Sequence, residues 1–164
     1  MTITTEPLTA AAFAPYGDVL AADSTDPKTI NQGKCKRHHD LANLDVTDGR
    51  AGISIFNAEP RALPYDLYLV ERHPDGAQTF IPMAQHPFLI IVASDDNGTP
   101  ANIRAFISNG AQGINFHKNT WHGVLTPLHA PGLFAVVDRI GSGSNLEEHW
   151  FENPLKIEGL TLYP

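Results

Sequence analysis

The segment from Glu71 to Gln78 gathers residue types that exchange protons and bind cations. Glu71 and His73 are two positions apart, so on a β-strand their side chains point to the same face. The turn Pro74-Asp75-Gly76 then reverses the chain, which brings Gln78 back beside His73. His122 can join this group if its strand faces the first one across a barrel. Two imidazoles and a carboxylate could transfer protons near neutral pH, or hold a divalent metal such as zinc, nickel, manganese or iron.

Short extended segments, rather than helices, must position these side chains. Alternating apolar and β-branched residues separated by turns rich in Gly, Pro, Asp and Asn predict strands. The predicted strands span 52–57, 65–73, 78–83, 87–94, 102–107, 113–117, 121–125 and 133–140. Helical turns are expected at 9–16, with Thr9 as N-cap and Pro15 at the end, and at 145–150. Short strands at this spacing predict an all-β sandwich or barrel, with 1–164 as a single domain.

The composition is that of a folded chain with an acidic balance. Apolar residues make up 42% of the 164 residues and charged residues 18%, as in a globular protein with a sizeable core. The net charge of −7 disfavours binding to nucleic acid or to anionic membrane surfaces. The longest apolar run, 88–93, is too short to cross a bilayer, and residues 1–17 lack the pattern of a secretory signal. We therefore expect a cytoplasmic protein whose ligand is a small molecule.

Cys35 is the single cysteine of the chain. One cysteine can form neither an internal disulfide nor a cysteine-based zinc site. A lone free cysteine can act as a nucleophile, but it is more often inert, so we expect no catalytic role for Cys35.

Two segments resemble signatures of the ureidoglycolate lyase family: Glu71 to Met83 (ERHPDGAQTFIPM) and Ser108 to His122 (SNGAQGINFHKNTWH). Three further stretches, at 13–20, 30–42 and 134–139, support the resemblance, and all five occur in the family's order. The resemblance implies a cupin-like double-stranded β-helix barrel with the active site inside. It also implies a carbon–nitrogen lyase that splits ureidoglycolate into glyoxylate and urea during allantoin and purine catabolism.

The resemblance also suggests a metal, although the ligand pattern departs from that of ordinary cupins. In the ordinary motif, two histidines and a glutamate lie on the first hairpin and a third histidine follows later. Here Glu71 stands at the first histidine, His73 at the second, Gln78 at the glutamate and His122 at the third. An amide is a weaker ligand than a carboxylate. The family is associated with a divalent metal, with nickel the first candidate and zinc or manganese the others. Many members carry a second histidine where this chain has Gly123, so that histidine is not essential here.

Ureidoglycolate is a carbinolamide, so its cleavage needs a base for the hydroxyl proton and an acid for the departing urea nitrogen. His73 and His122 are the candidate bases and metal ligands, because imidazole titrates near ~6.5. Glu71 could orient His73 or act as the acid. Gln78 could donate a hydrogen bond to the substrate or complete a metal shell.

The carboxylate of the substrate calls for a guanidinium, which can bind it bidentately. Arg139 and Arg37 are the candidates, and the sequence leaves the choice between them open. Arg139 follows Asp138, but neighbouring side chains alternate on a strand, so a direct ion pair between them is not expected. Trp121, beside His122, could form a wall of the site or belong to the core.

Three other functions remain open at this stage. A different cupin activity, such as a metal-dependent dioxygenase or a sugar-phosphate isomerase, would need a fuller metal shell. An amidohydrolase acting on ureidoglycolate would release ammonia and carbon dioxide instead of urea. A small-molecule binding module would use the same pocket without turnover.

We also expect a homodimer, because barrels built from two sheets leave an edge or an apolar outer face to cover, and because the family looks dimeric. The candidate contact segments are the N-terminal arm, Ile3 to Leu8, and the apolar tail, Phe151 to Tyr163. The tail could dock on its own barrel instead.

Overall fold

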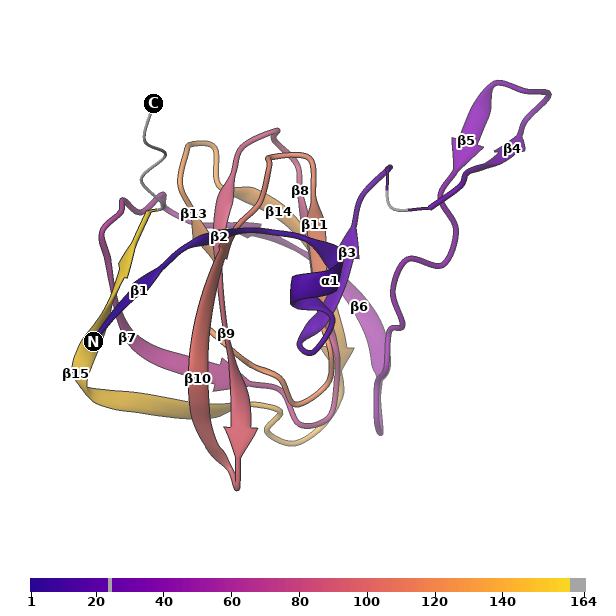
Figure 1. The fold of residues 1–164 in the computed structure, drawn as a ribbon. Coiled ribbons are helices and arrows are strands. Elements are labelled where there is room, and N and C mark those ends of the chain that lie inside the picture. Colours follow the sequence, from indigo (N-terminus) through magenta and orange to yellow (C-terminus); the bar gives the residue numbers. More distant parts are fainter. Residues whose placement is uncertain (24, 160–164) are drawn as a thin grey trace, which may run out of the picture.

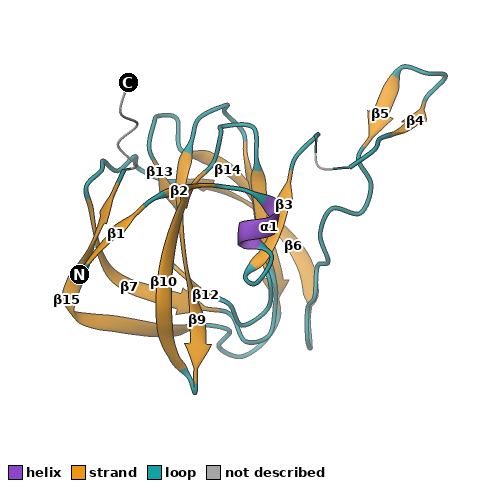
Figure 2. Cartoon of the chain, in the orientation of Figure 1, coloured by secondary structure: helices purple, strands orange, loops and turns teal. Residues whose placement is uncertain are grey.

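Two β-sheets form most of the computed structural model, which describes residues 1–23 and 25–159 (Figures 1 and 2). The larger sheet has the order β1-β15-β7-β12-β9-β10-β2, with β13 beside β9. Its strands are β1 (Thr2–Thr4), β15 (Glu147–Glu158), β7 (Tyr65–Arg72), β12 (Trp121–His122), β9 (Phe88–Asp96), β10 (Thr99–Ile107), β2 (Glu6–Pro7) and β13 (Thr126–Pro127). The smaller sheet, β3-β11-β8-β14-β6, comprises β3 (Gly17–Leu20), β11 (Gly113–Phe116), β8 (Gln78–Pro82), β14 (Leu133–Ile140) and β6 (Arg50–Asn57). Together they form the nearly closed, cupin-like β-barrel that the sequence predicts.

The central strand β9 is buried on both faces, which explains its uninterrupted apolar run. Ile90 and Val92 point into one core, which lies between the two sheets and includes Phe80 and Phe116 of the smaller sheet. Leu89 and Ile91 point into a second core on the opposite face of β9. Side chains alternate along a strand, so a strand covered on both sides must be apolar at every position.

Most of the expected elements are present. The predicted strands at 52–57, 65–73, 78–83, 87–94, 102–107, 113–117 and 133–140 are confirmed within a few residues. The predicted helical turn is confirmed as α1 (Ala10–Phe13), where the side chain of Thr9 accepts a hydrogen bond from the Ala12 backbone N–H at 3.2 Å. The predicted helical turn at 145–150 is wrong, because β15 begins at Glu147. Within the described part of the chain, no helix is long and apolar enough to span a membrane.

Both ends of the described chain pair with the larger sheet. β1 runs parallel to β15, β2 runs parallel to β10, and β15 is antiparallel to β7. The two segments that the sequence suggested for a dimer contact therefore dock on their own barrel over the residues described. The final part of that tail, 160–163, lies outside the described residues.

A hairpin projects from the barrel at the right of Figure 1. Its strands, β4 (Lys28–Ile30) and β5 (Cys35–Arg37), pair with each other in a two-stranded sheet. We call residues 28–37 the arm. After the arm, the segment 38–49 returns to the smaller sheet, where Val46 bridges Gly76.

Candidate functional site

His122 lies at the centre of the candidate site, where the two sheets meet. The short strand β12 runs between β7 and β9, which sets His122 opposite both Glu71 and Val92. Its imidazole is 1% exposed and stacks on the ring of Phe116, with ring centroids 4.1 Å apart and planes 4° apart. The flanking strands and the opposite sheet therefore fix both the position and the plane of this ring.

Glu71 and His73 extend from the end of β7 toward His122. One ligand atom from each of the three residues lies within 4.8 Å of the others. The His73 and His122 ring centroids are 5.3 Å apart, and His73 Nε2 is 4.0 Å from a carboxylate oxygen of Glu71. The spacing of two residues on one strand thus places Glu71 and His73 on one face, as the sequence predicts.

Both imidazoles present an unpartnered nitrogen to this site. His73 Nδ1 lies 2.7 Å from the carbonyl of Asn145, and His122 Nδ1 lies 3.0 Å from the carbonyl of Gly123. A nitrogen facing a carbonyl must carry the proton, so each neutral ring has its lone pair on Nε2. Both Nε2 atoms are buried without a hydrogen-bond partner in the described chain. Lone pairs held in this way can accept a proton or bind a cation.

Burial controls the protonation of the site. Burial first, and then the charge of His73, lowers the pKa of His122 to about 3, so this imidazole is neutral at pH 7. Burial raises the pKa of the Glu71 carboxyl above its ordinary value, while His73 lowers it and Glu148 raises it. Glu148 is the direct cross-strand partner of Glu71 on β15.

Gln78 and Asp138 enter the same space from the smaller sheet. Gln78 lies opposite Phe116 in the β8–β11 pair, and partners in an antiparallel pair share a face. Gln78 Nε2 donates a hydrogen bond of 3.5 Å to Asp138, and Gln78 Oε1 is buried without a partner in the described chain. We did not single out Asp138 as a site residue from the sequence. Its signal was the alternation along β14, because Asp138 follows the buried Phe134 and Val136 on one face.

These donors fit a divalent metal. Two imidazole nitrogens and a carboxylate converge. In each imidazole, a backbone carbonyl fixes the other ring nitrogen, as is usual for metal-binding histidines. The unpartnered amide oxygen of Gln78 is a weaker possible fourth ligand.

The structure places Arg139 and Trp121 on faces that point away from this group. Arg139 Nε donates to the carbonyl of Thr47 at 2.6 Å, and one of its terminal nitrogens donates to the carbonyls of Asp48 and Ser142. Arg139 thus fastens the segment 38–49 to the barrel instead of pairing with Asp138. Trp121 belongs to the second core, opposite the face of His122.

Trp121 also has polar partners at the edge of that second core. Its indole N–H donates to Asp95 at 2.8 Å, and the guanidinium of Arg72 lies 4.4 Å from its ring centroid. Arg37 is exposed on the arm, so the chain's own fold does not bring it to Glu71 and His122. The structure therefore gathers Glu71, His73, Gln78 and His122 but leaves the predicted carboxylate-binding residues outside.

Known proteins that resemble this chain match it over nearly its whole length. A family model described as ureidoglycolate lyase matches residues 1–158. A protein of Rhodobacter capsulatus named ureidoglycolate lyase is 54% identical over 155 residues, which cover 94% of this chain and 96% of that protein. Ureidoglycolate lyase 2 of Rhizobium meliloti is 47% identical over 93% of this chain and 94% of its own length. The ureidoglycolate lyase of Pseudomonas syringae pv. tomato is 48% identical over 95% and 94%.

Proposed function

We propose, since the chain belongs to the ureidoglycolate lyase family, that it cleaves ureidoglycolate into glyoxylate and urea. The observation that carries this proposal is the pair of buried, unpartnered Nε2 atoms beside the Glu71 carboxyl. Cleavage of a carbinolamide requires a proton acceptor and a proton donor held around one carbon. Relatives that match nearly the whole chain are named ureidoglycolate lyase, which favours the lyase over the amidohydrolase and the binding module.

We assign the proton transfers to His73 and Glu71. His73 Nε2 is the acceptor for the hydroxyl proton, because the Asn145 carbonyl holds the proton on Nδ1 and leaves the lone pair on Nε2. Once Glu71 has given up its own proton, its carboxylate, 4.0 Å from His73 Nε2, stabilises the imidazolium that forms. The half-buried Glu71 carboxyl, whose pKa is raised by its burial, donates a proton to the departing urea nitrogen. Gln78 Oε1 accepts a hydrogen bond from a urea N–H group.

A divalent metal bound at this place would be held by Glu71, His73 and His122, and it would replace the proton transfers assigned to Glu71 and His73, because a nitrogen lone pair or a carboxylate bound to a metal cannot exchange a proton. When bound, it would act as a Lewis acid on the hydroxyl oxygen that becomes the glyoxylate carbonyl. We propose nickel first, with manganese and zinc as the alternatives. Metal content should be measured before and after chelation, and activity after adding back each metal. Chelation that removes all metal without changing turnover would refute the requirement.

The direct test is incubation of the purified protein with racemic ureidoglycolate, with urea, glyoxylate and ammonia all measured. A lyase produces urea and glyoxylate in equal amounts and no ammonia. Ammonia in place of urea would establish the amidohydrolase, and ligand-dependent thermal stabilisation without product would establish a binding module. His73→Ala should lower kcat by roughly 100-fold or more in a folded protein. Normal kcat in that variant would contradict the role of His73.

We also propose that the enzyme works as a homodimer in the cytoplasm. The single, unpaired Cys35 is consistent with a reducing compartment. Cell fractionation alongside a cytoplasmic marker tests the location, and light scattering at micromolar concentration tests the oligomeric state.

A further inference from the structure

The arm is a two-stranded sheet of its own, separate from both sheets of the barrel (Figure 1). Its two strands pair with each other, and isolated two-stranded hairpins are marginally stable in water. Yet residues 30–37 of the arm belong to the stretch 30–42, which carries part of the family resemblance. A hairpin of this kind becomes more stable when it packs against another protein surface.

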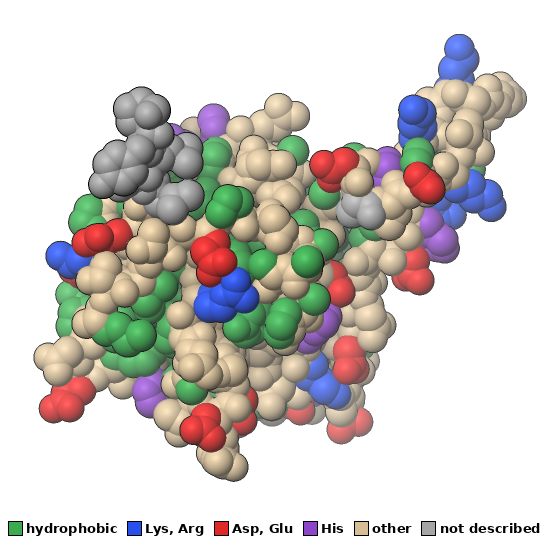
Figure 3. Space-filling view, viewed as in Figure 1, with side chains coloured by type: hydrophobic (Ala, Val, Ile, Leu, Met, Phe, Trp, Pro, Cys, Tyr) green, Lys and Arg blue, Asp and Glu red, His purple; other side chains and the backbone are tan. Residues whose placement is uncertain are grey.

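Charge indicates what the arm docks on. Residues 28–37 hold four of the eleven basic residues and no acidic residue, so the rest of the chain has seven bases against eighteen acids. Figure 3 shows Lys and Arg side chains gathered on the projecting hairpin. Lys28 and Arg37 are direct cross-strand partners, and like charges in this position repel each other. An anion placed between them would remove the repulsion.

The active site, in contrast, is short of positive charge. Ureidoglycolate and glyoxylate carry a carboxylate, whereas Glu71, Asp138 and Glu148 are acidic. Three basic side chains close in sequence to site residues already have partners: Arg72 pairs with Asp95 and Glu147, Lys118 with Asp45, and Arg139 with three backbone carbonyls. A cation supplied from outside the chain would complete the site.

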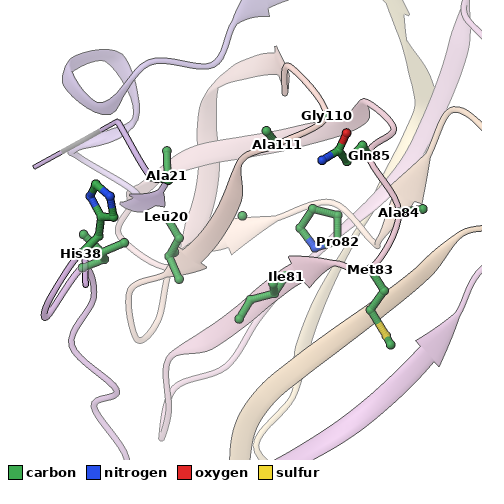
Figure 4. A pocket seen from close by; sticks show the side chains of 13 residues that line it. Leu20, Ala21, His38, Ile81, Pro82, Met83, Ala84, Gln85, Gly110 and Ala111 are labelled. Carbon is green, nitrogen blue, oxygen red and sulfur yellow. The ribbon is translucent and has the colours of Figure 1, made fainter. Parts of the chain in front are cut away.

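An apolar surface beside the arm offers a place for a second copy. On the outer face of the smaller sheet, Ile53 is 78% exposed, Ile55 59% and Met83 58%. A groove of about 470 Å³, lined mainly by apolar residues that include Leu20 and Ile81, joins this face to the segment that follows the arm (Figure 4). Exposed apolar faces of this kind are usually covered by a partner.

We propose that two copies of this chain pair through the outer faces of their smaller sheets, and that Arg37 on each arm binds the substrate carboxylate in the partner's active site. The proposal rests on the proposed function, because the carboxylate is that of ureidoglycolate. A guanidinium binds a carboxylate bidentately, and Lys28 opposite Arg37 adds a second positive charge. The basic arm of one copy and the acidic body of the other attract each other. Because each copy supplies its arm to the other, each dimer contains two composite sites.

Kinetics of Arg37→Ala test the role of the residue. Removing a charge-assisted pair with a carboxylate should raise KM for ureidoglycolate by roughly 10- to 100-fold and weaken inhibition by glyoxylate to the same degree. Lys34→Ala is the matched control, since Lys34 is exposed in the turn of the same arm, and its KM should stay within about twofold of the wild type. An unchanged KM in Arg37→Ala would overturn the proposal.

Subunit mixing tests whether Arg37 acts between copies. Arg37→Ala and His122→Ala chains carrying different tags are expressed together, and the mixed dimer is purified. In a composite site, the intact arm of the His122→Ala chain serves the intact His122 of the other chain. About half of the wild-type kcat/KM should therefore return, because one of the two sites is complete. A kcat/KM of the mixed dimer no higher than that of the Arg37→Ala parent would overturn the proposal.

Further outcomes separate the composite site from its alternatives. Arg50 on β6 is the competing cation within the chain, since it makes one long hydrogen bond of 3.4 Å to the carbonyl of Ala51. A raised KM in Arg50→Ala with a normal KM in Arg37→Ala would overturn the proposal, as would a monomeric wild type. A wild type that does not cleave ureidoglycolate would refute the proposed function as well, whereas an active wild type without rescue refutes the composite site alone.

Discussion

Replacing His122 by phenylalanine separates catalysis from folding at this site. The substitution keeps an aromatic ring of similar size against Phe116, on which the imidazole now stacks at 4.1 Å. It removes the unpartnered Nε2 and the Nδ1 contact of 3.0 Å with the carbonyl of Gly123. Stability alone would favour phenylalanine at this position, because the side chain is 1% exposed.

The expected change in stability follows from two opposing contributions. Losing the hydrogen bond to Gly123 costs about 1 kcal/mol, while removing a buried nitrogen without a partner stabilises the folded state by about 1–3 kcal/mol. The free energy of unfolding should therefore rise by about 0–2 kcal/mol. For a domain of this size, the melting temperature then rises by up to roughly 6 °C, or stays unchanged. His122→Ala should instead lower stability by about 2–4 kcal/mol, because it leaves a cavity.

Urea denaturation measures stability, and release of glyoxylate and urea measures activity. We expect kcat of His122→Phe to fall by roughly 100-fold or more, although the protein is as stable as the wild type. Two results would refute the reasoning. Normal turnover would show that Nε2 has no part in catalysis, and a loss of several kcal/mol would show that Nε2 has a stabilising partner.

Three smaller predictions follow from the rest of the structure. Cys35→Ser should leave kcat and KM within about twofold of the wild type, and complete loss of turnover in a folded variant would show a catalytic thiol. Trp121→Phe should cost about 1–3 kcal/mol, because it removes the indole bond to Asp95, without changing kcat, since the ring faces away from the site. A hydrogen bond from Arg104 lowers the pKa of Glu6, so the stability this pair contributes is present above the unfolded pKa of ~4.3 and disappears as pH falls through the lower folded value. Relative to Glu6→Gln, the wild type should thus lose an advantage of at most about 1 kcal/mol below pH ~4, and a constant difference from pH 3 to 7 would contradict the assignment.

Local patterns in the sequence predicted much of the site and the fold. Alternation on one strand places Glu71 and His73 on one face, because a strand repeats every two residues whatever it packs against. The same rule separates Trp121 from His122, since adjacent residues point to opposite faces. Turn residues and alternation likewise located most of the barrel strands. Local patterns did not predict the strands at the two ends of the chain, because β1 and β15 become strands by pairing with distant parts of the chain.

The amino-acid sequence thus specifies the chemical types in the site, the faces they occupy on their own strands, and the family. The packing of the barrel settles which of these faces meet. It brought His122 opposite Glu71, set Asp138 beside Gln78, committed Arg139 to backbone carbonyls and carried Arg37 away on the arm. The physical reason is that a strand's periodicity is local, whereas its neighbours are chosen by burial and hydrogen bonding summed over the whole barrel.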